Sequence, residues 1–186
     1  MRPRDLSEFA GQEHILGPGK LLRRSIETDR FMSLILYGPP GAGKTALAHL
    51  IAEKSKAHFI ALNAVTAGVA DIRRVAQEAA EERAQSGKRT LLFIDEIHRF
   101  TRVQQDALLP DVEQGTITLI GASTQNPFFA IIPALSSRSQ IFEFKPLKIE
   151  DIRTILRRAL ADRERGFGAI AVTLTDEARE FIIARS

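Results

Sequence analysis

The stretch Gly38-Pro39-Pro40-Gly41-Ala42-Gly43-Lys44-Thr45 follows the apolar run LILY and precedes a segment with helical spacing of its apolar residues. It satisfies the pattern G-x-x-x-x-G-K-[ST] in the strand-to-helix setting that this pattern requires. Glycines let backbone N–H groups turn towards phosphates, and the helix start adds its positive dipole end. We predict a nucleotide-binding loop in which Lys44 reaches the β- and γ-phosphates and Thr45 binds Mg²⁺. A glycine-rich turn without a ligand is the alternative.

Two adjacent acids, Asp95 and Glu96, end the apolar run TLLFIDE at 90–96. In a parallel sheet this strand end lies at the same edge as the phosphate loop, because ligands bind outside the carboxyl ends of the strands. We predict that Asp95 holds Mg²⁺ directly or through water and that Glu96 polarises the attacking water. Taken alone, the pair could be a solvated strand end.

Short apolar runs alternate with helical patterns along the first 145 residues, which is typical of a parallel sheet covered on both faces. The runs are LILYG at 34–38, HFIALN at 58–63, TLLFIDE at 90–96, TITLIGAS at 116–123 and QIFEF at 140–144. Pro146 follows the fifth run closely and disfavours continued central pairing there. The sequence therefore predicts an α/β fold with one doubly wound sheet of five strands and crossover helices between them.

The pattern changes after Pro146. Residues 149–166 and 175–186 read as two amphipathic helices, the second with Thr175 as its N-cap. The second pattern reaches Ser186 without a stop signal. We expect an α/β nucleotide-binding domain over 1–145 and the start of a helical lid over 146–186, with the lid incomplete in this chain.

Composition narrows the class of protein without deciding its function. The 186 residues are 44% hydrophobic and 26% charged, with a formal net charge of +3, which suits a nucleic-acid partner but does not require one. There is no cysteine, and the four histidines are scattered, so the sequence offers no metal-ligand cluster. Neither a membrane-spanning apolar run nor a signal peptide is visible, which favours the cytoplasm.

Larger motifs carry a family resemblance. GPPGAGKT, LLFIDEIHRF and RPRDLSEFAGQEHIL together resemble the clamp-loader branch of AAA+ ATPases. VTAGVADIR, DEIHRF with QQDALLP, and GTITLIGASTQNPFF resemble the replication-associated recombination protein A family and its eukaryotic relatives, the Werner-helicase-interacting proteins. The resemblance covers nearly all of the chain. It implies a three-layer AAA+ fold with strand order 5-1-4-3-2, and Mg-dependent ATP hydrolysis coupled to DNA remodelling at stalled or damaged replication forks.

The resemblance also implies roles for three further residues. Thr124 matches the sensor 1 position that reads the γ-phosphate, with Asn126 as the competing candidate. Asn63 matches a polar residue that holds the catalytic glutamate inactive until a partner binds, although asparagine also simply suits a strand end. Arg138 in LSSRS matches the arginine of the Ser-Arg-Cys motif, with Ser139 in place of cysteine, and it is expected to reach the γ-phosphate of a neighbouring copy. A solvated surface arginine is the alternative.

The partners implied by the resemblance are DNA forks, junctions between single strands and duplex, and further copies of the chain in a ring-like homo-oligomer. Single-strand-binding protein or other replication proteins are further candidate partners, and no membrane partner is expected. The expected location is the bacterial cytoplasm, in association with the nucleoid. The sensor 2 arginine and the oligomerisation domain of the family would fall beyond Ser186. Phe128 and Phe129 follow the fourth predicted strand, and we expect them to belong to the core and not to form exposed contacts. Candidates for neutralising DNA phosphates are Arg73, Arg74, Arg83, Lys88, Arg99 and Arg102.

The sequence also leaves rival functions open. A clamp-loader subunit shares every catalytic motif, but VTAGV and HRF with QQDA argue against it. A non-hydrolysing, nucleotide-gated scaffold would need neither Glu96 nor Arg138. A small-molecule kinase lacks a lid for an acceptor substrate, and a GTPase lacks the Asn-Lys-x-Asp guanine reader.

Overall fold

A single parallel sheet organises the chain. The computed structural model describes residues 2–170 and 172–185. Its strands lie in the order β2-β3-β4-β1-β5, and every pairing is parallel. The strands are β1 (Ser33–Tyr37), β2 (His58–Asn63), β3 (Thr90–Asp95), β4 (Ile117–Ser123) and β5 (Ser139–Glu143). Read from the other edge this is 5-1-4-3-2, so the predicted fold class is confirmed.

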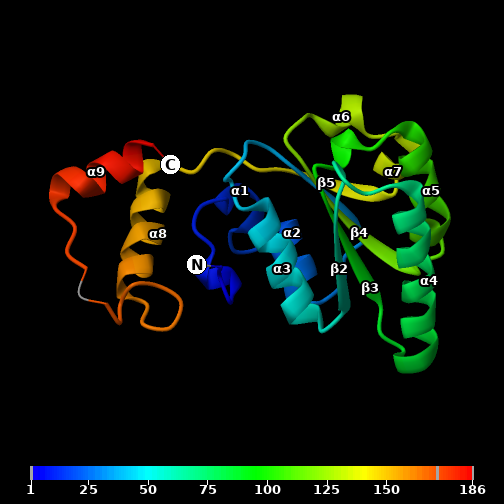
Figure 1. Cartoon of the computed structure of the whole chain (residues 1–186), viewed down its shortest axis with the longest axis horizontal. Helices are drawn as coiled ribbons and strands as arrows, with labels where there is room; N and C mark the ends of the chain where they lie inside the picture. Colours follow the sequence, from blue (N-terminus) through cyan, green and yellow to red (C-terminus); the bar gives the residue numbers. More distant parts are fainter. Residues whose placement is uncertain (1, 171, 186) are drawn as a thin grey trace.

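Helices cover both faces of the sheet and give it three layers (Figure 1). The long helices are α2 (Leu21–Glu27), α3 (Lys44–Ser55), α4 (Val69–Ser86), α5 (Arg102–Glu113), α8 (Ile149–Ala161) and α9 (Asp176–Ala184). The short ones are η1 (Leu6–Glu8), α1 (Glu13–Leu16), η2 (Ile97–Arg99), α6 (Pro127–Ala130) and α7 (Pro133–Ser136). In Figure 1, α2 and α3 lie on one side of the sheet, and α4 and α5 lie on the other.

Each face of the sheet has its own hydrophobic core. Along β1, Leu34 and Leu36 point into a core shared with α2 and α3, whereas Ile35 points into a core shared with α4, α5 and α7. Successive side chains of a strand face opposite ways, so a strand that is buried on both faces must be apolar throughout. This explains why β1, β3 and β4, at the centre of the sheet, are nearly continuous apolar runs in the sequence.

Helix ends agree with the sequence signals. Helix α4 ends at Gly87, whose φ of +71° is the left-handed conformation that favours glycine at this position. The Thr175 side chain accepts a hydrogen bond from the backbone N–H of Ala178, which confirms the predicted N-cap of α9. Helix α8 begins after Lys148, whose backbone N–H donates to the Asp151 carboxylate at 2.9 Å.

Helices α8 and α9 lie on the far side of the N-terminal segment from the sheet (Figure 1). The division into domains at 145/146 remains a prediction. Within residues 2–170 and 172–185, no helix combines the length and the apolar character needed to cross a membrane.

Candidate nucleotide-binding site

The predicted phosphate loop joins the carboxyl end of β1 to the first turn of α3. The backbone N–H of Gly38 donates to the carbonyl of Ser123 at the end of β4, which fixes the start of the loop against the neighbouring strand. Lys44 is only 7% exposed, and its Nζ donates to the carbonyl oxygens of Gly38 and Pro39, each at 2.8 Å. Burial lowers the pKa of Lys44, while the carboxylates of Glu96 and Asp95 act in the opposite direction. The buried ammonium group therefore lies inside the loop and in the field of the two acids.

Two glycines of the loop are required by close approaches of the backbone. Gly38 has a φ of +147°, and a Cβ there would overlap the carbonyl oxygen of Phe144. Gly43 has a φ of +100°, and a Cβ there would lie 2.9 Å from Cζ of Phe9. Helix α3 begins immediately afterwards, so its first backbone N–H groups have no intrahelical partner. Unpaired N–H groups, a positive dipole end and a lysine together suit the phosphates of a nucleotide.

The acids at the end of β3 lie beside this loop, as the sequence predicts. Asp95 accepts a hydrogen bond from the backbone N–H of Glu96 at 3.1 Å through Oδ1. Glu96 adopts a φ of +54°, an uncommon conformation for a residue with a side chain. The hydroxyl of Thr124 donates to Oε2 of Glu96 at 3.2 Å. The structure thus joins Thr124 to the predicted catalytic glutamate.

His98, which was not among the predicted site residues, also contacts the glutamate. The side chain of His98 is 4% exposed, and its Nε2 lies 3.2 Å from Oε2 of Glu96. Its Nδ1 lies 3.2 Å from the hydroxyl of Ser123. That hydroxyl also donates to the carbonyl of Gln125 at 2.7 Å. His98 therefore connects the ends of β3 and β4, and its place two residues after Glu96 in DEIH is the signal that could have indicated it.

No hydrogen bond joins the side chain of Asn63 to Glu96. Its side-chain oxygen accepts from the backbone N–H of Val65 at 2.8 Å, which closes the turn after β2. Asn63 is level with Asp95 in the pairing of β2 with β3, so it lies at the same edge of the sheet. Asn126 caps α6 through a hydrogen bond from the backbone N–H of Phe128 at 3.0 Å.

Arg138 lies at the opposite edge of the sheet from the phosphate loop. It directly precedes β5, whose first residue Ser139 pairs with Ser33 at the start of β1. The loop begins five residues further along β1, which corresponds to about 16 Å at the rise of a strand. The guanidinium contacts Oε1 of Glu113 at 2.6 Å and donates to the carbonyl of Ala134 at 2.8 Å. Arg138 therefore does not take part in the site of its own chain.

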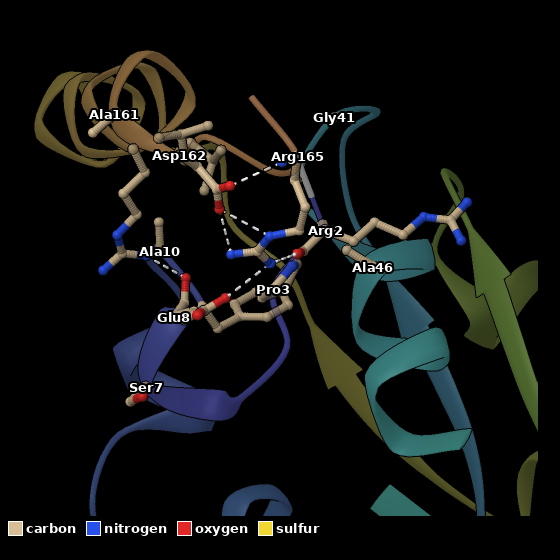
Figure 2. A pocket seen from close by; sticks show the side chains of 16 residues that line it. Arg2, Pro3, Ser7, Glu8, Ala10, Gly41, Ala46, Ala161, Asp162 and Arg165 are labelled. Carbon is tan, nitrogen blue, oxygen red and sulfur yellow. Dashed lines mark hydrogen bonds and ion pairs between the residues drawn. The ribbon is translucent and has the colours of Figure 1, made fainter. Parts of the chain in front are cut away.

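A cavity of about 640 Å³ adjoins the phosphate loop (Figure 2). Three segments that are far apart in the sequence line it. They are the N-terminal segment from Arg2 to Ala10, the loop and first turn of α3 from Gly41 to Ala46, and the region of α8 from Leu147 to Arg165. Apolar side chains from each segment, including Phe9, Ala46 and Ile155, contribute to its wall. Such a mixture of apolar wall and a few polar groups is common in sites for small ligands.

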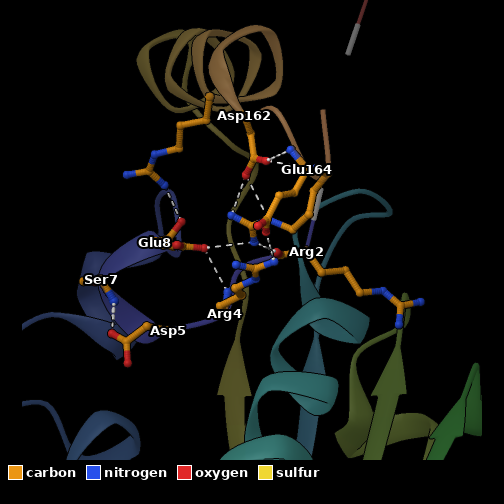
Figure 3. A network of polar contacts seen from close by, with 9 residues as sticks. Arg2, Arg4, Asp5, Ser7, Glu8, Asp162 and Glu164 are labelled. Carbon is orange, nitrogen blue, oxygen red and sulfur yellow. Dashed lines mark hydrogen bonds and ion pairs between the residues drawn. The ribbon is translucent and has the colours of Figure 1, made fainter. Parts of the chain in front are cut away.

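Polar contacts tie the N-terminal segment to the region after α8 (Figure 3). Arg165 binds the Asp162 carboxylate at 2.7 Å and lies 3.4 Å from the Glu8 carboxylate. Arg158 donates to the carbonyl of Glu8, and the backbone N–H of Arg4 donates to the Glu8 carboxylate at 2.9 Å. The hydrogen bond from this N–H lowers the pKa of Glu8. These contacts hold the two outer walls of the cavity together.

Buried Gln12 fixes the N-terminal segment to the phosphate loop itself. Its Nε2 donates to the carbonyls of Lys145 at 2.7 Å and Ala42 at 3.3 Å. Its Oε1 accepts from the backbone N–H of Lys145 at 3.0 Å. One side chain thus joins the start of the chain, the loop and the connection to α8. Gln12 was not among the predicted site residues, because its partners are backbone groups that no motif reveals.

Comparisons with known proteins agree with this geometry. Residues 34–147 match the family described as ATPase family associated with various cellular activities (AAA). Replication-associated recombination protein A from Escherichia coli (strain K12) is 47% identical over 182 residues, covering 98% of this chain and 40% of that protein. ATPase WRNIP1 from Dictyostelium discoideum is 47% identical over 160 residues, covering 86% of this chain and 18% of that protein.

A solved structure is also similar over the whole chain. The Thermotoga maritima RuvB Holliday junction branch migration motor superposes with a TM-score of 0.74 at 28% identity, covering 100% of this chain and 60% of that one. The chain spans 40% of the length of the E. coli relative.

Proposed function

The chain belongs to the AAA family of ATPases, and from this premise we propose that it couples Mg-dependent ATP hydrolysis to the remodelling of DNA at stalled or damaged replication forks. Its relatives bear names that link them to replication and recombination, and the similar RuvB is named as a motor for Holliday junctions. The observation that carries the proposal is the meeting of a phosphate loop, a buried lysine and two acids at one edge of the sheet.

In this proposal residues 38–45 bind the phosphates through backbone N–H groups, and Lys44 leaves its carbonyl partners to meet the β- and γ-phosphates. Thr45 and Asp95 hold Mg²⁺, since a hydroxyl and a carboxylate supply the oxygen ligands that this ion prefers. The ion, when bound, neutralises charge on the phosphate oxygens.

Glu96 orients and polarises the attacking water. Its Oε2 is engaged by Thr124 and His98, so the carboxylate is held at a fixed position at the edge of the sheet. We propose that Thr124 exchanges this contact for the γ-phosphate, which would make it the sensor 1 residue. Asn63 could take part only if the turn that it closes with Val65 rearranges.

The cavity between the N-terminal segment and α8 receives the adenosine part of the nucleotide. It is continuous with the phosphate loop through Gly41, Ala42 and Gly43, and its apolar wall suits a base. Residues 146–186 then act as the beginning of a lid, because α8 supplies one wall and the loop supplies another. The polar contacts of Glu8 with Arg158 and Arg165 would respond to nucleotide through this shared wall.

Arg138 acts on a neighbouring copy. Its position about 16 Å along the strand direction from its own loop leaves a second chain as the route by which it meets a γ-phosphate. A guanidinium suits this task because it keeps its charge and offers several donors in a planar fork. A ring-like homo-oligomer is the assembly in which every copy receives such an arginine.

An ATPase assay with different DNA substrates tests the proposed function directly. The ATPase rate is measured for the protein in its assembled form with single-stranded, duplex, gapped and forked DNA. We expect DNA to raise the rate, with the largest effect from substrates that contain a fork or a junction. A rate that no DNA changes would remove the coupling to DNA, and loading of a sliding clamp in a reconstituted system would favour a clamp-loader subunit instead.

A further inference from the structure

Two adjacent phenylalanines on α6 are exposed. The fractional exposure of Phe128 is 71% and that of Phe129 is 91%, which corrects the expectation that they belong to the core. Helix α6 instead buries Pro127 and leads into buried Ile131. Val103, in the first turn of α5, is also 68% exposed. Large apolar side chains that stand free on one part of a surface commonly mark a binding site.

The aromatic pair is fixed to the segment that carries two arginines. The side chain of Gln105, which is 2% exposed, donates to the carbonyls of Phe100 at 3.1 Å and Ala130 at 3.0 Å. Its oxygen accepts from the backbone N–H of Ile132 at 2.9 Å. Nε2 of Gln105 thus binds the carbonyls of both Phe100 and Ala130. Arg99 directly precedes the first of these residues, and Phe129 directly precedes the second. The aromatic and basic side chains therefore stand on neighbouring, rigidly joined segments.

The two arginines on this part of the surface are not paired with acids of the described residues. Arg99 and Arg102 are exposed, and within the described part of the chain their guanidinium groups make no hydrogen bond or ion pair. Several other arginines among the described residues are paired with an acid, as Arg89 is with Asp29. Asp106 lies one turn along α5 from Arg102, and the described residues give these two no ion pair.

We propose that Phe128, Phe129, Val103, Arg99 and Arg102 form a binding surface for single-stranded DNA, which we call the Phe–Arg surface. Bases stack on the phenylalanine rings, and the arginines neutralise the phosphates between them. Duplex DNA would satisfy the arginines only, because its bases are already stacked on one another. The proposal rests on the proposed function and specifies which part of a fork this domain contacts.

A second copy of the chain is a less suitable occupant. Phenylalanine and arginine also occur in protein interfaces, but burying two unpaired guanidinium groups against a protein surface requires two matching acids on the partner. A single strand offers a partner for the phenylalanine rings and a partner for the arginines, since every nucleotide carries an aromatic base and a negatively charged phosphate. The charge and the aromatic rings together favour the nucleic acid.

The test compares two probes of equal length, oligo(dT) and an abasic oligodeoxynucleotide that has the phosphates but no bases. Binding of each is measured by fluorescence anisotropy for the chain and for the double variant Phe128→Ala/Phe129→Ala. We expect the parent to prefer oligo(dT) by about tenfold or more, and the double variant to lose that preference while its binding to the abasic probe is unchanged. Exposed substitutions of this kind leave the free energy of unfolding almost unaffected, so both proteins remain comparable.

The arginines have a separate signature. For a single strand, log K falls with log salt with a slope of about −0.7 for each phosphate neutralised. Arg99→Ala/Arg102→Ala should therefore make the slope shallower by about 0.7 for each arginine that meets a phosphate, on both probes. The phenylalanine variant should keep the parental slope. This division between base preference and salt dependence would not arise from a general loss of structure.

Matched controls come from other parts of the chain. Phe181 on α9 is 59% exposed and lies at the other end of the molecule, so Phe181→Ala removes similar aromatic area elsewhere (Figure 1). Arg30 is exposed in the turn before β1, at the amino edge of the sheet, so Arg30→Ala removes a similar charge. Both controls should bind oligo(dT) as the parent does.

Four outcomes would overturn the proposal. The first is that the parent binds both probes equally, and the second is that the phenylalanine variant binds oligo(dT) as the parent does. The third is that the parent binds oligo(U) more tightly than oligo(dT). The fourth is that the phenylalanine variant keeps its DNA binding but loses self-association, as measured by ultracentrifugation. Each leaves the proposed function intact, provided that duplex or forked DNA still binds. A protein that binds no DNA of any kind would instead remove the proposed function.

Discussion

Replacing Arg138 by alanine separates a catalytic role from a structural one, because the structure predicts very different magnitudes for the two. Its ion pair with Glu113 joins side chains that are 42% and 45% exposed. Pairs as exposed as this contribute less than about 1 kcal/mol to stability, since water screens them. Against a typical stability of about 5–15 kcal/mol, such a loss leaves nearly every molecule folded.

The expected loss of activity is far larger. An arginine that meets the γ-phosphoryl in the transition state is worth about 10³–10⁵ in rate. We therefore expect Arg138→Ala in the assembled protein to bind ATP almost normally, to unfold at nearly the parental urea concentration and to hydrolyse ATP at least about a thousandfold more slowly. Arg30→Ala, also at the amino edge of the sheet, is the matched control and should keep the parental rate.

Mixing variants tests whether the arginine acts on a neighbour. Lys44→Ala lacks nucleotide binding at its own loop but retains Arg138, and Arg138→Ala has the reverse defect. In a mixed assembly an intact loop can meet an intact arginine from the next copy, so part of the ATPase rate should return. If the two variants demonstrably assemble together and no rate returns, Arg138 does not act on the nucleotide of a neighbouring copy.

Three further substitutions have distinct signatures. Glu96→Gln should keep Mg·ATP binding in a calorimetric titration and nearly abolish hydrolysis, because only the activation of water is lost; hydrolysis at the parental rate would contradict its role. Gly38→Ala should lower the free energy of unfolding by about 1–3 kcal/mol, since its Cβ meets the carbonyl of Phe144 at a φ of +147°; an unchanged urea midpoint would exclude this strain. A hydrogen bond from Lys54 lowers the pKa of Asp5 from 3.8 to about 2, so its stabilisation is present above pH 4 and is lost towards pH 2. Asp5→Asn should thus be less stable than the parent at pH 7, and the difference should shrink below pH 4; a difference that is independent of pH would argue against the ion pair.

The strands and the phosphate loop could be predicted from the sequence because their signals are local. The central strands β1, β3 and β4 are almost entirely buried and mostly apolar, and the partly exposed edge strands β2 and β5 still carry Phe and Ile, so each run is visible within one residue of its ends. The loop 38–45 is likewise defined by the glycines and the lysine that its backbone needs. Neither depends on contacts between distant parts of the chain.

Contacts between distant side chains could not be predicted in this way. The packing of His98 against Glu96 and Ser123 depends on how far β3 and β4 are offset, which no run of residues encodes. The cavity wall unites residues more than a hundred positions apart in the sequence. The expectation that Phe128 and Phe129 are buried, which rested on their hydrophobicity, is wrong. A four-residue helix that buries Pro127 and leads into buried Ile131 cannot also bury two adjacent rings.

The polarity of a parallel sheet constrains how copies of this chain could share their sites. Arg138 lies at the amino edge and the loop 38–45 at the carboxyl edge, so an arginine that serves a neighbour joins two different surfaces of the two chains. Such a contact is heterologous and repeats from head to tail, in contrast to a two-fold dimer, in which one patch meets its own copy. In an open row the last loop has no arginine opposite it, whereas a closed ring completes every site. Under the proposed role of Arg138, ring closure and full ATPase activity are therefore the same event.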